Sequence, residues 1–238
     1  MNIVKRISRI LALCAVYIVC AYSYLMAKGF VFTGETMILS NQAYAKDDGK
    51  FAHEVTGDII LSKEMMRPLG NDNAPLTIYA YSSMACSHCR DFHKFILPKI
   101  KRDFIKTGKV RFVFVHFPLE ATSMRAAKLS YCLPEDKFEA FITELYDNKD
   151  WLFSKDGATL NKYAKDFGMT EKALVACADN KKLTSDILLS RDTAIKSFGI
   201  EGTPSFIVDG FGKKELIVGS QSYDELKEYL ESRLEGKK

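Results

Sequence analysis

Two cysteines separated by two residues stand between a strand pattern and a helix pattern, and this arrangement constrains the fold more than any other feature. Cys86 and Cys89 follow residues 76–81, which are rich in β-branched and aromatic side chains and are typical of a strand. Apolar residues then recur at helical spacing from Phe92 to Phe104. The sequence therefore predicts that a strand turns into a helix at this pair, with Cys86 near the helix start.

The start of a helix favours an anion. Its unpaired backbone N–H groups and the positive end of the helix dipole stabilise a thiolate, so we expect the pKa of Cys86 to fall well below the free-thiol value of about 8.5. His88 lies between the two cysteines and can add positive charge or a hydrogen-bond donor to the same sulfur. A stabilised thiolate favours the reduced pair, which makes the disulfide a strong oxidant. The pair is therefore predicted to transfer its disulfide to the thiols of other molecules.

The first 45 residues are typical of an export segment. Three basic residues precede an uncharged run over residues 10–27, an order that places the N-terminus in the cytoplasm and the remainder outside. The run is long for a signal peptide and barely sufficient for a spanning helix. Cleavage after Ser23 or after Ala45 and retention as a membrane anchor therefore both remain open, whereas a buried core helix fits the basic flank poorly.

The net charge and the number of cysteines indicate which partners and which cellular compartment to expect. The net charge is +4, of which roughly +1 remains outside the first 45 residues, so no nucleic-acid partner is expected. Outside that segment the cysteines are Cys86, Cys89, Cys132 and Cys177, an even number that suggests two pairs in an exported protein. If the first two pair locally, Cys132 and Cys177 either bridge each other, which would stabilise the fold by roughly 3–4 kcal/mol, or remain two separate buried thiols.

The remaining pattern alternates between strands and helices. Strands are predicted at residues 57–61, 76–81, 110–116, 205–208 and 216–218, with a hairpin turn at 209–212. The helix after Cys89 carries Pro98 in its interior, so we expect a kink there. Further helices are predicted at residues 121–132, 135–147, 158–167, 171–179, 182–197 and 222–234.

This order resembles the thioredoxin fold, and the helical block before Thr203-Pro204 resembles the DsbA-like thiol:disulfide oxidoreductases of the bacterial envelope. The supporting stretches lie within residues 83–89, 92–98, 111–119 and 199–206. The resemblance implies an α/β protein, a thioredoxin fold with an inserted helical domain. Its parts would be a signal or anchor with spacer (1–45), the first thioredoxin part (46–118), the insert (119–197) and the second thioredoxin part (198–238).

The resemblance also implies a role for each residue of the motif. Cys86 would be the exposed nucleophile and Cys89 the buried resolving thiol. Ser87 and His88 would tune the Cys86 thiolate. Relatives usually have proline at the position of Ser87, so a redox potential cannot be transferred to this chain.

Outside the motif, the resemblance implies residues that contact substrate, and the chain differs from the family at one buried position. Pro204 would be a cis-proline that faces the disulfide, and Thr203 would shape the contact with substrate. Thioredoxin and many relatives carry a buried carboxylate six residues before the first cysteine, and this chain has Ala80 there. Water or another group must therefore accept the proton of Cys89.

The function expected from these features is an exported oxidase that introduces disulfides into secreted or envelope proteins. Reduced or unfolded exported proteins would be its substrates, a DsbB-like membrane protein would reoxidise it in the periplasm, and it would be a monomer without a cofactor. The alternative on the same fold is a disulfide isomerase or reductase, because Thr203 also resembles the residue before the proline of isomerases. Residues 46–75 are too short for the dimerisation domain of such enzymes, which favours the oxidase.

Two other classes of protein remain as alternatives. Cys86, Cys89, His93 and His116 could hold zinc, although a Cys-x-x-Cys site usually needs a second clear ligand pair, so no metal site is predicted. A chaperone or adhesion protein could carry the cysteine pair as a vestigial disulfide that has no redox function. The aromatic residues Trp151, Tyr146 and Phe153 are predicted to pack the helical block, or else to line a substrate groove.

Overall fold

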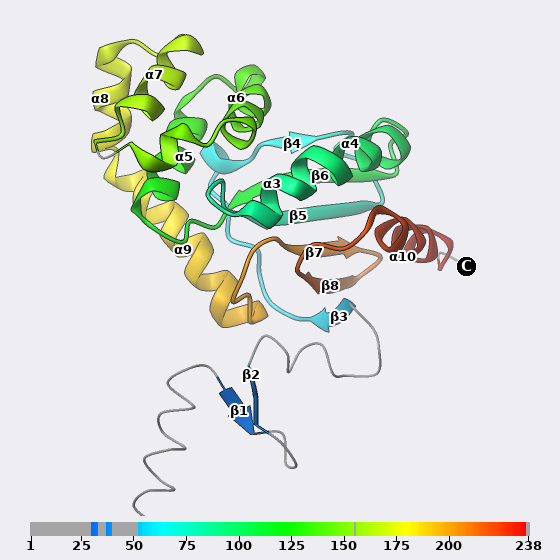
Figure 1. The fold of residues 1–238 in the computed structure, drawn as a ribbon. Helices are drawn as coiled ribbons and strands as arrows, with labels where there is room; N and C mark the ends of the chain where they lie inside the picture. Colours follow the sequence, from blue (N-terminus) through cyan, green and yellow to red (C-terminus); the bar gives the residue numbers. More distant parts are fainter. Residues whose placement is uncertain (1–29, 33–36, 40–51, 155, 237–238) are drawn as a thin grey trace, which may run out of the picture. The chain divides into compact units, whose positions relative to one another are not determined.

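The computed structural model describes residues 30–32, 37–39, 52–154 and 156–236, in two units (Figure 1). In the first unit, β1 (Phe30–Phe32) pairs antiparallel with β2 (Met37–Leu39). The apolar run at residues 10–27 and both expected cleavage sites lie outside the described residues. Among the helices that are described, none has the length and apolar character needed to cross a membrane.

The second unit, which starts at Ala52, is built on a mixed six-stranded sheet. The central strand β5 (Leu76–Ser82) runs parallel to β6 (Val110–His116) and antiparallel to β7 (Ser205–Gly210). The strand order is β3-β8-β7-β5-β6-β4, with β3 at Ala52–Val55, β4 at Pro68–Leu69 and β8 at Lys213–Val218. A parallel pair needs a crossover, which the helix after Cys86 provides between β5 and β6.

The two faces of the sheet are covered by different helices because alternate side chains of a strand point to opposite faces. On one face, Phe92 of the helix after Cys86 lies 4.6 Å from Phe206 and 6.3 Å from Phe112, measured between ring centroids. On the other face, Ile207 of β7 packs in a buried cluster with Phe198 from the end of α9 (Lys181–Phe198). Figure 1 shows α9 running from the helical block towards the sheet.

The helix that follows Cys86 is irregular. It consists of α3 (Ser87–Asp91), a π-helical stretch at Phe92–Ile96, α4 (Leu97–Ile100) and a second π-helical stretch at Lys101–Ile105. We call residues 87–105 the Cys86 helix. The disruption expected at Pro98 takes the form of a wider turn, in which the Leu97 N–H donates to the Phe92 carbonyl just before the proline.

The helical block follows β6 and ends before β7. Its helices are α5 (Ala121–Cys132), α6 (Glu135–Asp147), a 3₁₀ turn at Asp150–Phe153, α7 (Ala158–Asp166), α8 (Glu171–Asp179) and α9. Trp151 is fully buried in this block, and its indole N–H donates to the Leu145 carbonyl at 2.9 Å. Tyr146 is buried as well, but Phe153 is 80% exposed, so the packing role predicted for Phe153 is wrong.

Most of the other predicted elements are confirmed, with one clear error. The hairpin turn between β7 and β8 has Phe211 and Gly212 at φ 55° and 75°, and α10 (Tyr223–Glu235) begins after a capping box at Ser222. The strand expected at residues 57–61 is wrong, because the first strand of the sheet is β3, five residues earlier. Gly57 has φ +134°, a conformation that interrupts a strand.

Candidate active site

The two cysteines of the motif occupy different environments at the start of the Cys86 helix. Cys86 immediately precedes α3, its N–H donates to the Ser83 carbonyl at 3.0 Å, and its carbonyl accepts from the Arg90 N–H at 3.1 Å. Cys86 is half-buried, less accessible than expected, whereas Cys89 is only 1% exposed. Both are free thiols in this structure, so it represents the reduced protein.

The thiol of Cys86 is strongly acidified. The hydrogen bond from the Cys89 thiol is the largest cause and, with help from Thr203 and from the backbone N–H groups of Cys89 and His88, it lowers the pKa of Cys86 to about 5. Partial burial opposes this shift but does not cancel it. Backbone donors of this kind are those expected at a helix start. Cys86 is therefore a thiolate at neutral pH.

The second thiol behaves in the opposite way. Burial raises the pKa of Cys89 well above its usual range, and the hydrogen bond with the Cys86 thiolate and the charge of that thiolate raise it further. At neutral pH the pair thus holds one proton, and this proton is on the buried sulfur of Cys89. A pair with one half-buried anion and one buried thiol has the groups required for thiol–disulfide exchange.

The sheet brings a distant loop to Cys86. Because β7 pairs with β5, Ser205 lies opposite Tyr81, and the Thr203–Pro204 bond, which is cis, lies next to the cysteines. As a thiol, Cys86 donates to the Thr203 carbonyl oxygen at 3.3 Å. The buried Thr203 hydroxyl lowers the pKa of both cysteines, and it has no hydrogen-bond partner among the described residues.

The residues between the cysteines contribute differently from what the sequence suggested. The side chains of Ser87 and His88 are both exposed. His88 lowers the pKa of Cys86 through its backbone N–H, and its imidazole is not among the groups that do so. The pKa of Cys86 is therefore lowered mainly by the Cys89 thiol and less by backbone N–H groups, and not by the charge of the His88 ring.

Sequence reasoning missed the contribution of α6 to the surroundings of the cysteines. Tyr146, near the end of α6, is 6% exposed. Its ring lies 4.8 Å from the ring of His93. The sequence predicted that Tyr146 packs the helical block, but no sequence signal shows that its ring also contacts His93 of the Cys86 helix.

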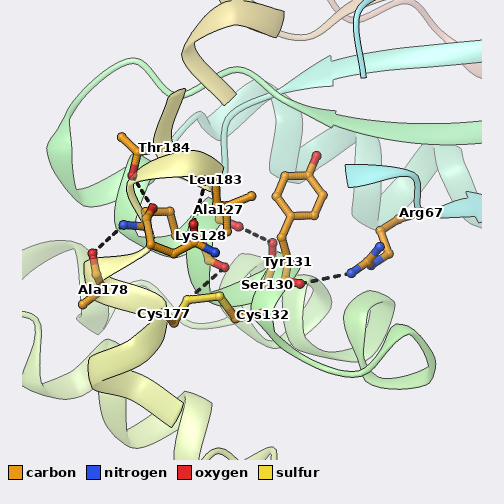
Figure 2. The surroundings of a disulfide bond; sticks show 11 residues. Arg67, Ala127, Lys128, Ser130, Tyr131, Cys132, Cys177, Ala178, Leu183 and Thr184 are labelled. Atoms are coloured by element: carbon orange, nitrogen blue, oxygen red, sulfur yellow. Dashed lines mark hydrogen bonds between the residues drawn. A yellow bond between two sulfur atoms is a disulfide. The ribbon is translucent and has the colours of Figure 1, made fainter. Parts of the chain in front are cut away.

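Cys132 at the end of α5 and Cys177 in α8 are joined by a disulfide (Figure 2). The bridge connects two helices of the block, and Lys128 reinforces this connection by donating to the Ala178 carbonyl at 2.6 Å. On the other side of α5, Arg67 donates to the Tyr131 carbonyl at 3.0 Å and so connects the block to the sheet through the segment before β4.

The histidines considered as zinc ligands do not join the cysteines. His93 is hydrogen-bonded to Thr143 at 2.8 Å and His116 to Ser130 at 2.7 Å. Over residues 52–154 and 156–236, no three histidine, cysteine or acidic side chains are grouped so that they could hold a metal ion. The geometry thus gives the zinc alternative no support.

Fold and site together define a Cys-x-x-Cys dithiol protein with a helical insert in a thioredoxin fold. The family described as Thioredoxin matches residues 62–232. The chain belongs to the thioredoxin family, and within that family it is DsbA-like.

Known proteins of this kind are similar over more than half of this chain. A protein-disulfide oxidoreductase of Rickettsia prowazekii is 28% identical over 60% of this chain, and disulfide bond formation protein D of Bacillus subtilis is 29% identical over 71%. The chain spans 53% of the Rickettsia relative's length and 77% of the Bacillus relative's length. Among solved structures, α-DsbA1 of Wolbachia pipientis is 26% identical, with a TM-score of 0.66 over 74% of this chain and 94% of that one.

Proposed function

We propose that this protein is an exported thiol:disulfide oxidase that introduces disulfides into reduced secreted or envelope proteins. The observation that carries the proposal is the asymmetry of the pair, in which the pKa of Cys86 is lowered to about 5 while that of buried Cys89 is raised. A stabilised Cys86 thiolate favours the reduced pair, so the disulfide form is driven to oxidise other thiols.

The reaction proceeds in two exchanges. A substrate thiolate attacks the Cys86 sulfur, a mixed disulfide forms, and the electron pair of the broken bond leaves on Cys89, which takes up a proton. A second substrate thiolate then attacks the substrate sulfur of the mixed disulfide, and Cys86 leaves as a thiolate. The substrate has lost two electrons, the pair has gained them, and a DsbB-like membrane protein would remove them again.

Several residues support this assignment by their positions. The carbonyl of Thr203 lies beside the Cys86 sulfur and can accept from a backbone N–H of an extended substrate, while Pro204 fixes the loop that presents it.

The basic residues and uncharged run of the first 45 residues support export to the periplasm, either cleaved or tethered through residues 10–27. The parts 46–118, 119–197 and 198–238 remain our proposed division of the chain.

A redox titration against glutathione tests the proposal. We expect a potential near the oxidising end of the family range, roughly −120 mV, and oxidation of reduced, unfolded ribonuclease A in stoichiometric amounts. A potential near roughly −270 mV would instead identify a reductant. The isomerase alternative, favoured by Thr203 before the proline, predicts rescue of scrambled ribonuclease A that exceeds the oxidation of the reduced form.

A further inference from the structure

A buried serine stands directly behind the loop that reaches Cys86. Ser205 is the first residue of β7, it is fully buried, and it lies opposite Tyr81 of β5. Its side chain points to the same side of the sheet as that of Ile207, because alternate residues of a strand share a face. That face carries the buried apolar cluster that includes Phe198, whereas the Cys86 helix covers the opposite face.

The hydroxyl of Ser205 closes the loop before β7. A hydroxyl in apolar surroundings is costly unless it forms a hydrogen bond, and this one donates to the Gly202 carbonyl, three residues earlier, at 2.8 Å. In the described part of the chain, no backbone N–H donates to that carbonyl. Many turns lack a closing bond between backbone groups, and here a side chain supplies it.

The closed loop presents Thr203 to the active site. The Thr203 carbonyl oxygen lies 3.3 Å from the Cys86 sulfur, and Thr203 directly follows Gly202. The bond from the Ser205 hydroxyl to Gly202 therefore spans the residues that carry this carbonyl, with one end on each side of them. A side chain on the face opposite the Cys86 helix is thus connected to the position of an atom beside the reactive sulfur.

Other restraints on this loop act at its two ends. Before the loop, Ile200 is fully buried and its N–H donates to the Ala194 carbonyl at 3.3 Å. After the loop, the Pro204 carbonyl accepts from the Gly219 N–H at 2.9 Å. Between these points, no atom beyond the chain neighbours of Gly202 lies within 4 Å of the place where its Cβ would be. Packing does not restrain this glycine, and its backbone is intrinsically free, so the hydroxyl bond holds it.

We propose that Ser205 is a positioning residue for substrate, whose hydroxyl holds Gly202 so that the Thr203 carbonyl is ready to accept from a backbone N–H of an extended substrate. A carbonyl that is fixed before binding loses less entropy on binding than a mobile one. The hydroxyl therefore favours reaction with polypeptides. A small thiol without a backbone N–H gains nothing from it.

The test compares two reductants of the oxidised protein by rapid mixing at pH 7. One is a short unstructured peptide that carries two cysteines, and the other is dithiothreitol, which has no peptide group. Loss of the Cys86–Cys89 disulfide is measured in acid-quenched samples by mass spectrometry of the alkylated cysteines.

We expect Ser205→Ala to lower the second-order rate constant of the peptide roughly three- to fivefold, because the substrate hydrogen bond to Thr203 is weakened but not removed. The rate constant of dithiothreitol should change less than twofold. A variant that disturbs the cysteines themselves would slow both reductants, so the ratio of the two rate constants reports positioning.

Two further variants separate the hydroxyl from the shape of the side chain. Ser205→Thr and Ser205→Val have nearly the same shape, and threonine alone keeps the hydroxyl. Threonine should retain the wild-type ratio of the two rate constants, and valine should lower it as alanine does. Because Gly202 is half-buried, water can donate to the carbonyl that alanine and valine set free, so the fold should persist.

Ser190→Ala is the matched control. Ser190 is a buried serine of α9, and its hydroxyl has no hydrogen-bond partner among the described residues. This variant removes a buried hydroxyl without removing a loop contact, so both of its rate constants should equal those of the wild type.

The inference rests on the exchange reaction proposed above, but the two fail differently. Equal losses from Ser205→Ala with both reductants, or no loss with the peptide, would overturn the role of Ser205 while leaving the oxidase proposal intact. Equal ratios for the threonine and valine variants would overturn that role as well. Oxidised wild-type protein that reacts with neither reductant would overturn the exchange reaction itself.

Discussion

The sulfur of Cys86 lies 3.3 Å from the carbonyl oxygen of Thr203, a residue 117 positions further along the chain. The contact exists because β5 ends at the cysteine loop while β7 begins beside it, so two chain segments with no local relationship form one site. The Thr203 hydroxyl is buried at the same place and lowers the pKa of both sulfurs.

Replacing Thr203 by valine keeps the shape of this side chain and removes its hydroxyl. Because this hydroxyl lowers the pKa of both sulfurs, we expect its removal to destabilise the reduced pair by about 1 kcal/mol at most, so that the redox potential falls by no more than roughly 20 mV. A glutathione equilibrium measures the change. A Thr203→Ser variant, which retains the hydroxyl, should keep the wild-type potential, and an equal shift in both variants would contradict a role for the hydroxyl.

The acidity of Cys86 depends on Cys89 more than on the imidazole of His88. Ultraviolet titration of the thiolate should give a midpoint near 5 in the wild type. Cys89→Ala removes the largest cause of the shift and should move the midpoint upward, whereas His88→Ala retains the backbone N–H and should move it less. A larger shift from His88→Ala would restore the imidazole to the tuning role expected from the sequence.

The same shift makes the reduced protein more stable than the oxidised protein at neutral pH. Because the pKa of Cys86 is lower in the folded protein than in the unfolded chain, the unfolded chain binds more protons between the two values. The contribution of Cys86 to the stability of the reduced form is therefore largest near the ordinary thiol pKa and is lost as pH falls through about 5, while above the ordinary thiol pKa the raised pKa of Cys89 reduces the advantage again. Urea unfolding of both redox forms from pH 4 to pH 9 measures it, and a pH-independent difference would contradict the mechanism.

His116 predicts a second pH dependence, unrelated to the cysteines. Burial, aided by the charge of Arg67, lowers its pKa to about 3, so the folded protein holds it neutral, bonded to Ser130. Since an unfolded histidine takes up a proton near pH 6.5, stability should be complete above that value and fall towards pH 3, by at most about 1.4 kcal/mol per pH unit for each such group. His116→Gln should flatten this slope in urea unfolding curves, and an unchanged slope would assign it to other groups.

The bridge between Cys132 and Cys177 should act on stability alone. It closes a separation of 45 residues, so replacing both cysteines by alanine should lower the free energy of unfolding by roughly 3–4 kcal/mol. Denaturant unfolding measures the loss, and the ultraviolet midpoint of Cys86 serves as the control. A shifted midpoint would show that the bridge also influences the site.

The parts of the site that could be predicted are those encoded locally. The strand, the cysteine pair and the helix start are adjacent in sequence, so a lowered pKa of Cys86 could be predicted from the helix start, although its largest cause is the hydrogen bond from the Cys89 thiol. The prediction of a strand at residues 57–61 was wrong because apolar residues there pack against the core without pairing in the sheet. The positive φ of Gly57 also interrupts the strand conformation. Tyr146 was predicted to pack the helical block, but its contact with His93 of the Cys86 helix is set by how α6 docks, which no local pattern encodes.

Three polar contacts join α6 to the Cys86 helix. Lys94 pairs with Asp147, Lys101 pairs with Glu139, and His93 is hydrogen-bonded to Thr143 at 2.8 Å. The helix that carries the two cysteines is therefore anchored to the helical block as well as to the sheet, so the residues that hold the Cys-x-x-Cys segment in place are not contained in the motif itself.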